Sequence, residues 1–207
     1  MFDLKSRNLY LCTPLRDDLA DFVVSALKGG VDVLQIRDKT ADAKTIIQYS
    51  REIRKITKDF GVPFIINDRP DIAIEVEADG VHIGQEDIPV SLARKIFPEA
   101  IIGLSTHGDK ELKASLSQDV DYISAGPIVA TPTKPGRPGV GQTYAEEASK
   151  LSPRPVFVTG GIQPSQIEDL ASMGIRHFVV VRYLTLAEDP YKAARLLREA
   201  INQALEI

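Results

Sequence analysis

Three polar side chains at alternating positions, Gln35, Arg37 and Lys39, are the first group in the sequence that could do chemistry. In an extended segment, residues two apart point to the same side. Two cations and an amide on one inward face are costly to bury unless an anion meets them. Arginine offers a forked contact to phosphate oxygens, and lysine a compact charge. The pattern predicts a phosphate site; the alternative is a layer of salt bridges with Asp38 or another acid.

Two carboxylates, Asp68 and Asp87, follow two later apolar segments that are neighbours along the chain. Carboxylates beside a phosphorylated ligand require a hard cation between them, and Mg²⁺ binds one or two carboxylates together with substrate phosphates. We therefore expect Asp68 and Asp87 to bind Mg²⁺. The structural alternatives are that Asp68 caps a helix beginning near Pro70 and that Asp87 caps a turn before Pro89.

A second anion site is predicted at Gly160 and Gly161, where Pro164 follows in the first turn of a helix. Free backbone N–H groups at a helix start bind phosphate, and Arg182 adds a cation at the same corner. The segment 126–141 is a long loop that carries Thr131, Thr133 and Lys134, and it could close over a bound phosphate. Ser105 has no evident base partner in the sequence, so it is expected to donate or accept a hydrogen bond. His82 and His107 are interpreted as structural residues.

Short apolar segments alternate with amphipathic ones along the whole chain, and they must position these groups. Strands buried on both faces, as in a parallel sheet, are predicted at 9–12, 33–37, 64–67, 80–83, 101–105, 122–125, 156–159 and 178–181. Helices are predicted at 18–27, 41–60, 70–76, 90–96, 109–116, 144–151, 164–173 and 190–205. Eight such units predict an α/β fold, a single (β/α)₈ TIM barrel over residues 1–207, with a doubly wound open sheet as the alternative. The candidate residues then gather at the carboxyl ends of the strands.

The composition limits the classes of partner. With 25 Lys and Arg against 29 Asp and Glu, the net charge is −4, which lacks the basic footprint of a nucleic-acid binder. No apolar run approaches the roughly 20 residues of a membrane span. The single cysteine, Cys12, is expected to be a buried apolar residue. We expect a cytoplasmic protein that binds small phosphorylated molecules, and the sequence leaves open whether it forms a homo-oligomer.

From residue 9 to residue 190 the chain resembles the thiamine-phosphate synthases, also called thiamine-phosphate pyrophosphorylases. The similar stretches occur in the family's order, at 34–39, 65–69, 78–87, 103–107, 126–127 with 131–134, and 160–162. The resemblance implies that 4-amino-2-methyl-5-(hydroxymethyl)pyrimidine diphosphate and 4-methyl-5-(2-phosphooxyethyl)thiazole are joined to thiamine phosphate with release of diphosphate. At the end of the eighth strand, this chain has Arg182 where many members carry a Ser-Ala-Ile-like stretch.

The resemblance also assigns roles to residues. It implies a pyrimidine diphosphate site made of Gln35, Arg37, Lys39, Asn67, Ser105 and Lys134. Of these, Arg37, Lys39 and Lys134 would stabilise the departing diphosphate. It implies Mg²⁺ at Asp68 and Asp87, and a thiazole phosphate site at Thr131, Thr133 and Gly161, to which Arg182 is added by its charge. The alternatives are a thiazole tautomerase on the same fold, a barrel enzyme acting on one sugar phosphate, and a non-catalytic protein that binds phosphorylated metabolites.

Overall fold

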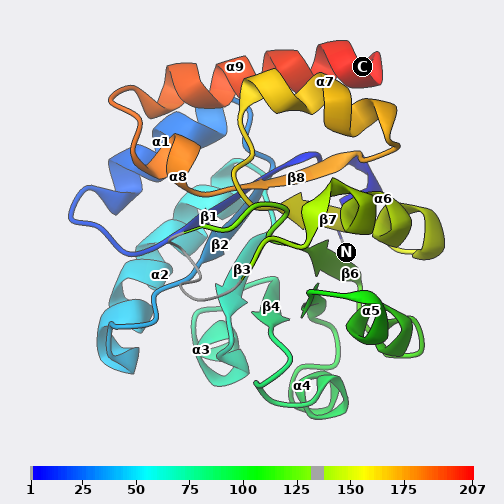
Figure 1. Ribbon diagram of the computed structural model, residues 1–207. Helices are drawn as coiled ribbons and strands as arrows, with labels where there is room; N and C mark the ends of the chain where they lie inside the picture. Colours follow the sequence, from blue (N-terminus) through cyan, green and yellow to red (C-terminus); the bar gives the residue numbers. More distant parts are fainter. Residues whose placement is uncertain (1, 132–137) are drawn as a thin grey trace.

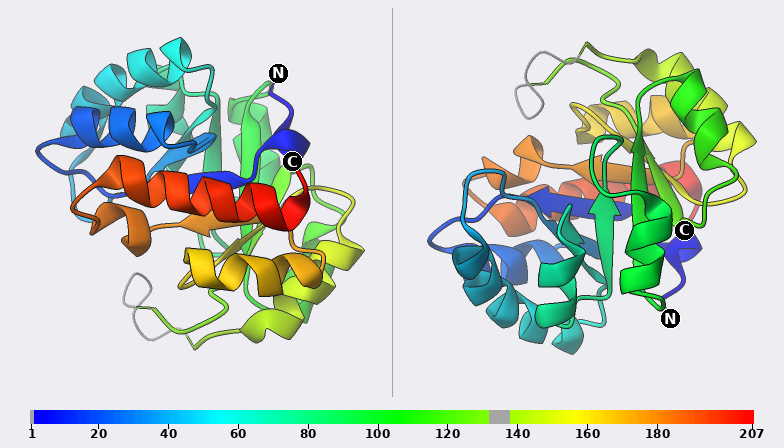
Figure 2. Two further views of the ribbon diagram at one scale, coloured as in Figure 1. Left: turned by 90° about the horizontal axis from the view of Figure 1, so that it is seen from above. Right: turned by 90° about the horizontal axis from the view of Figure 1, so that it is seen from below.

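Eight parallel strands form a closed barrel in the order β1-β2-β3-β4-β5-β6-β7-β8, which confirms the (β/α)₈ prediction. The computed structural model describes residues 2–131 and 138–207. Each strand is followed by a helix that packs on the outside of the barrel, so the strands occupy the centre of the molecule (Figure 1). In the views of Figure 2 the last helix, α9 (Pro190–Leu205), lies between α1 (Leu19–Lys28) and α7 (Pro164–Ser172), which it contacts.

The elements agree closely with the segments that the sequence predicts. The strands are β1 Leu9–Thr13, β2 Val33–Ile36, β3 Phe64–Asn67, β4 Gly80–Ile83, β5 Ile101–Thr106, β6 Tyr122–Ala125, β7 Val156–Thr159 and β8 His177–Val180. The other helices are η1 Leu4–Ser6 (a 3₁₀ turn), α2 Ala43–Asp59, α3 Pro70–Glu75, α4 Val90–Ile96, α5 Asp109–Ser115, α6 Gly141–Leu151 and α8 Arg182–Thr185. The short α8 was not expected, because four residues are too few to show a helical period.

Helix starts follow ordinary capping chemistry. The side chain of Asp42 accepts a hydrogen bond from the N–H of Thr45 at 2.9 Å, and Asp189 does the same for Lys192 at 3.0 Å. Proline occupies the first turn of α3, α7 and α9, where its missing N–H costs no intrahelical bond. These residues mark where α2, α3, α7 and α9 begin.

The core has two layers, because successive residues of a strand point to opposite sides of the barrel wall. In β1, Leu9 and Leu11 point outward into the layer between strands and helices, whereas Tyr10 and Cys12 belong to the layer inside the barrel. Both layers are almost fully buried. Cys12 is therefore a buried residue, as expected, and it also lines the cavity described below.

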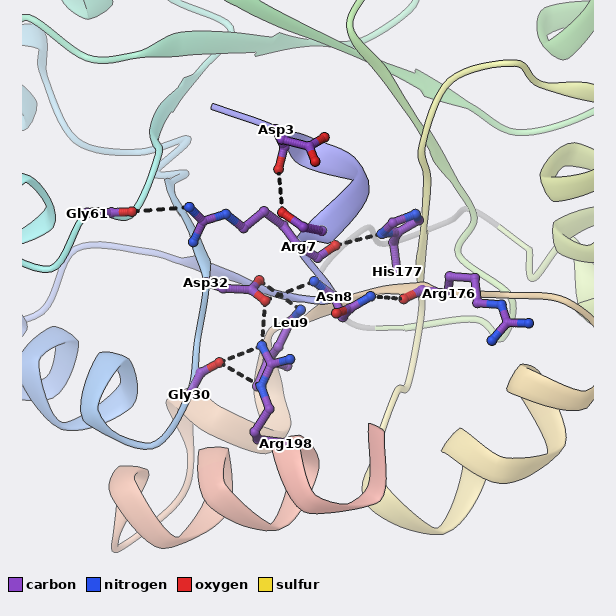
Figure 3. A network of polar contacts seen from close by, with 11 residues as sticks. Asp3, Arg7, Asn8, Leu9, Gly30, Asp32, Gly61, Arg176, His177 and Arg198 are labelled. Atoms are coloured by element: carbon purple, nitrogen blue, oxygen red, sulfur yellow. Dashed lines mark hydrogen bonds and ion pairs between the residues drawn. The ribbon is translucent and has the colours of Figure 1, made fainter. Parts of the chain in front are cut away.

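The amino end of the barrel is closed by an ion-pair network around Asp32, the residue before β2 (Figure 3). Its carboxylate accepts the backbone N–H groups of Asn8 and Leu9, both at 2.9 Å, and pairs with Arg198 of α9. Arg198 also donates to the carbonyl of Gly30 at 2.7 Å. One carboxylate thus connects β1, β2 and the last helix, at the end of the barrel opposite to the candidate residues.

The same arrangement recurs before β4 and β6. Asp79 accepts the N–H of Phe64 in β3 at 2.8 Å and pairs with Arg54 of α2 at 2.7 Å. Asp121 accepts the N–H of Ile102 in β5 at 2.8 Å and pairs with Arg94 of α4 at 2.7 Å. We call these three groups, each an aspartate before an even-numbered strand with its arginine, the aspartate clamps. Before β8 the corresponding residue is Arg176, which carries no carboxylate.

Candidate functional site

A cavity of about 420 Å³ lies at the carboxyl end of the barrel, where the sequence predicts the site. This volume is in the range of small-molecule sites, about 300–1,000 Å³. Seven of the residues assigned to the two substrate sites line it: Gln35, Arg37, Asn67, Ser105, Thr131, Gly161 and Arg182. Thr133 and Lys134 lie outside the residues that the structure describes. The cavity thus joins the two predicted phosphate corners in one space.

The first corner is formed by β2, β3 and β5. Gln35 is 4% exposed, and within the described part of the chain its Nε2 atom has no hydrogen-bond partner. A buried donor without a partner costs about 1–3 kcal/mol. The side chain of Arg37 follows on the same face and also lines the cavity, together with Asn67 at the end of β3. Such a corner holds donors ready for the oxygens of a ligand.

Lys39 does not continue this face, because β2 ends at Ile36 and the alternation that brings Gln35 and Arg37 to the cavity does not extend to Lys39. Its side chain is 53% exposed and forms an ion pair with Asp68 instead of lining the cavity. The alternative of salt bridges with Asp38 or another acid therefore holds for Lys39, which pairs with Asp68. Asp38 instead accepts hydrogen bonds from the N–H groups of Leu15 and Ala41.

Asp68 and Asp87 lie together beside the cavity, as their positions after β3 and β4 predict. Burial raises the pKa of Asp68, and the neighbouring Asp87 carboxylate raises it further, although Lys39 acts against both. Burial also acts to raise the pKa of Asp87, but a hydrogen bond from Asp68 and the N–H of Gly84 at 2.7 Å outweigh it, so this pKa is lowered. The two carboxylates therefore interact directly, and Asp68 is the one that takes up a proton more readily.

Of the two structural alternatives for these carboxylates, the turn at Asp87 is present and the helix cap at Asp68 is not. Asp87 does accept the N–H of Gly84 and so closes the expected turn. Asp68 is not the cap of α3, because that position belongs to Arg69. Asp68 has a left-handed backbone with φ of 61°, and its N–H donates to the carbonyl of His82 at 2.7 Å. A non-glycine residue in this region is uncommon and often marks a functional position.

The donor set fits a magnesium ion. Two neighbouring carboxylates are ligands that a divalent cation prefers, and Mg²⁺ completes its shell with water and substrate phosphates. Among the described residues, no group of three or more His, Cys, Asp or Glu side chains is arranged as a metal site. A site made of two carboxylates therefore depends on the ligand for the remaining oxygens.

The second corner lies where the loop after β6 meets the turn after β7. Gly160 and Gly161 have φ of +112° and +76°. A Cβ atom on Gly160 would lie 2.5 Å from the backbone nitrogen of Ile128, and one on Gly161 would lie 2.7 Å from a methyl of Val129. These glycines therefore bring the Thr131 segment against the start of α7. Arg182, the first residue of α8, borders the same part of the cavity.

Sequence reasoning missed two parts of the site. His82, interpreted as structural, lines the cavity, and its Nε2 lies 2.9 Å from the Oγ of Ser105, a partner that the sequence did not reveal. Their inward positions on β4 and β5 could have indicated this contact. The apolar wall was also missed; it includes Val129, Ile162, Val179, Val181, Tyr183 and Leu186. This wall gives the cavity space for an apolar ring between its two polar corners.

All the residues that line the cavity except Leu186 fall inside a region with known relatives. The sequence profile described as thiamine monophosphate synthase matches residues 9–184. The chain belongs to the thiamine monophosphate synthase family. This confirms the resemblance that the sequence motifs indicate. Within the described residues of this family member, no helix has both the length and the apolar character that a membrane crossing requires.

Curated members of the family share about two fifths of their residues with the chain. The thiamine-phosphate synthase of Thermobifida fusca is 43% identical over 208 residues, with 97% of this chain and 95% of the relative covered. That of Thermosynechococcus vestitus is 42% identical over 201 residues, covering 97% of this chain but 57% of the relative. The chain thus spans little more than half the length of some family members.

Solved structures agree with the fold. A thiamine phosphate pyrophosphorylase from Pyrococcus furiosus is 29% identical, with 96% of each chain covered and a TM-score of 0.88. A 3-hexulose-6-phosphate synthase, at 18% identity and a TM-score of 0.65 over 93% of this chain, shows the same barrel fold and nothing more specific. The family member described here therefore keeps the common architecture over nearly its whole length.

Proposed function

We propose that the protein is a thiamine-phosphate synthase. It joins 4-amino-2-methyl-5-(hydroxymethyl)pyrimidine diphosphate and 4-methyl-5-(2-phosphooxyethyl)thiazole to thiamine phosphate and releases diphosphate. The observation that carries the proposal is the buried Nε2 of Gln35, which has no partner among the described residues and lies beside Arg37 in the cavity. The cluster of Lys39, Asp68 and Asp87 lies next to it. A corner of this kind suits a diphosphate with a bound cation.

The proposed reaction separates charge. The bond between the pyrimidine methylene carbon and the diphosphate oxygen breaks, and its electron pair leaves with the diphosphate. The electron-rich aminopyrimidine carries the positive charge until the lone pair of the thiazole nitrogen forms the new C–N bond. Arg37, Lys39 and Lys134 stabilise the departing diphosphate, and Gln35, Asn67 and Ser105 orient the substrate. Magnesium at Asp68 and Asp87, when bound, supplies further positive charge for the leaving group.

The second corner suits the thiazole phosphate. The turn of Gly160 and Gly161 offers backbone N–H groups at the start of α7, and Arg182 and Thr131 border it. Thr133 is assigned to the same phosphate by the resemblance. The apolar wall around Val129 and Ile162 leaves little space for water beside the reacting carbon, which favours attack by the thiazole nitrogen over hydrolysis.

The test is an assay of the purified protein with both substrates and Mg²⁺. Thiamine phosphate and diphosphate should appear in equal amounts, and EDTA should stop both. Isomerisation of a thiazole carboxylate without diphosphate release would identify a tautomerase. Binding of both substrates without turnover by folded protein would identify a metabolite-binding protein. Either result would overturn the proposal.

Replacing Gln35 by methionine separates binding from stability. We expect the KM for the pyrimidine diphosphate to rise by about one to two orders of magnitude, as for the loss of one or two hydrogen bonds to a charged group. The thermal midpoint should stay the same or rise, because the variant removes a buried donor that has no partner within the described residues. Steady-state kinetics and thermal unfolding are the measurements.

The matched control is Gln85→Met, because the Nε2 of Gln85 donates to the carbonyl of Ser105 at 2.6 Å. That variant loses a protein hydrogen bond, so its thermal midpoint should fall. If Gln35→Met loses stability as Gln85→Met does, the Gln35 side chain has a structural role and its assignment to the substrate is wrong.

A further inference from the structure

Four polar side chains inside the barrel form a continuous chain of hydrogen bonds. The Oγ of Ser105 lies 2.9 Å from the Nε2 of His82, whose Nδ1 lies 3.0 Å from the hydroxyl of Tyr122. That hydroxyl lies 2.8 Å from the hydroxyl of Tyr10. Ser105 and His82 line the cavity, whereas the two tyrosines lie below it and are at most 2% exposed. This series of hydrogen bonds therefore leads from the interior of the barrel to the cavity.

Packing fixes the position of the central ring. Gly103 of β5 faces the Tyr122 ring, and a Cβ atom there would lie 2.1 Å from its Cζ. The rings of Tyr10 and Tyr122 each meet Phe157 edge-on, with centroids 5.3 Å apart in both cases. His82 stacks on Tyr122 at a centroid distance of 5.5 Å. The hydroxyl of Tyr122 is therefore held between its two partners.

The direction of the hydrogen bonds follows from Tyr10. Burial raises the pKa of both tyrosines, so each phenol keeps its proton. Among the described residues, the hydroxyl of Tyr10 has one partner, Tyr122, and it must donate there to avoid a buried unsatisfied donor. Tyr122 then donates to the Nδ1 of His82. Because Nδ1 accepts, the ring proton lies on Nε2, which donates to the Oγ of Ser105.

We propose that Tyr10, Tyr122 and His82 form a relay of positioning residues that fixes Ser105 as a hydrogen-bond donor to the substrate. With its oxygen accepting from His82, the Ser105 hydroxyl turns its proton toward the cavity, where it meets an acceptor atom of the bound molecule. The identity of that molecule rests on the proposed function. The direction of the relay does not.

The direction can be measured without any substrate. ¹⁵N NMR of the imidazole rings distinguishes a proton on Nε2 from one on Nδ1, and a His82→Gln variant assigns the signal among the 3 histidines. We expect a proton on Nε2 of His82 and none on Nδ1. A proton on Nδ1 alone would make Nε2 an acceptor from Ser105 and so reverse the relay, and a proton on both nitrogens would break the link from Tyr122 to His82. Either result would refute the proposal even if the protein is an active synthase.

The coupling to Ser105 can be measured by a double-mutant cycle. Tyr122→Phe removes a hydroxyl that does not line the cavity, and we expect kcat/KM for the pyrimidine diphosphate to fall about tenfold, the effect of one hydrogen bond of ordinary strength. In a Ser105→Ala background the same substitution should have no further effect. Effects that multiply in the double variant would show that Tyr122 acts independently of Ser105, against the relay.

Two further variants keep the test clear. Tyr144→Phe removes the hydroxyl of a buried tyrosine on α6 that does not line the cavity, so it should leave kcat/KM unchanged. If Tyr122→Phe does not fold, Tyr10→Phe is the milder change: it removes the donor that sets the direction and should give a smaller loss that Ser105→Ala again abolishes. An inactive wild-type protein would refute the proposed function, and the NMR experiment would still decide the relay.

Discussion

Asp68→Asn is expected to lower the metal-dependent turnover about 10²–10³-fold, the usual effect of losing one strong electrostatic contact in an active site. Asparagine keeps the shape of the side chain but removes the charge that a divalent cation and Lys39 require. Steady-state kinetics over a range of Mg²⁺ concentrations would measure the loss. A second measurement is Mn²⁺ binding in the presence of inorganic diphosphate, followed by electron paramagnetic resonance, which should weaken in parallel.

Stability should not follow activity in this variant. Burial and Asp87 raise the folded-state pKa of Asp68 above its unfolded value, so at neutral pH the ionised form is penalised in the folded protein. Removing that carboxylate should leave the midpoint of unfolding unchanged or slightly higher. The control is Asp71→Asn on α3, which breaks the exposed pair with Arg69 and should not change turnover. Full activity and unchanged Mn²⁺ binding in Asp68→Asn would rule out Asp68 as a metal ligand.

At the opposite end of the barrel, Asp32→Ala is expected to lower the free energy of unfolding by about 3 kcal/mol. The substitution leaves Arg198 without its counter-charge and the N–H groups of Asn8 and Leu9 without their acceptor (Figure 3). The side chains of Arg198 and Asp32 are 20% and 15% exposed. Because they are not fully buried, water can replace the lost contacts in part, which limits the cost. Urea unfolding, followed by circular dichroism, would measure the change.

The comparison is Asp119→Ala, which also removes the aspartate partner of an arginine. Asp119 is 77% exposed and lies 3.2 Å from Arg94. Its loss should cost less than about 1 kcal/mol, as for other surface pairs. Equal costs for the two variants would mean that the carboxylate of Asp32 contributes no more than a surface charge.

The fold could be predicted because its strands are buried on both faces. Segments such as 64–67 and 156–159 are apolar without alternation, a pattern typical of parallel strands covered by helices. Eight such segments, separated by amphipathic ones, are compatible with few sheet topologies. The ends of elements were less certain: β2 stops at Ile36, one residue earlier than expected, and this changes where Lys39 lies.

The site could be predicted where a residue's position after a strand determines its place. Gln35, Asn67 and Ser105 reach the cavity for this reason. The contact between Ser105 and His82 could not be predicted from composition or motifs, because it depends on which side chains face inward on two neighbouring strands. Tyr10 and Tyr122 are 112 residues apart in the sequence. Each lies in an apolar strand segment, and nothing in those two segments indicates that their hydroxyls form a hydrogen bond.

The aspartate clamps join β1 to β2, β3 to β4 and β5 to β6, but β7 and β8 have no such clamp because Arg176 stands at the corresponding position. Side-chain contacts of this kind are therefore distributed unevenly around the barrel. The corner of Gln35 and Asn67 rests on clamped strands, whereas Gly161 and Arg182 follow the two strands without a clamp. From this distribution we expect the corner of Gln35 and Asn67 to be held more rigidly than the corner of Gly161 and Arg182.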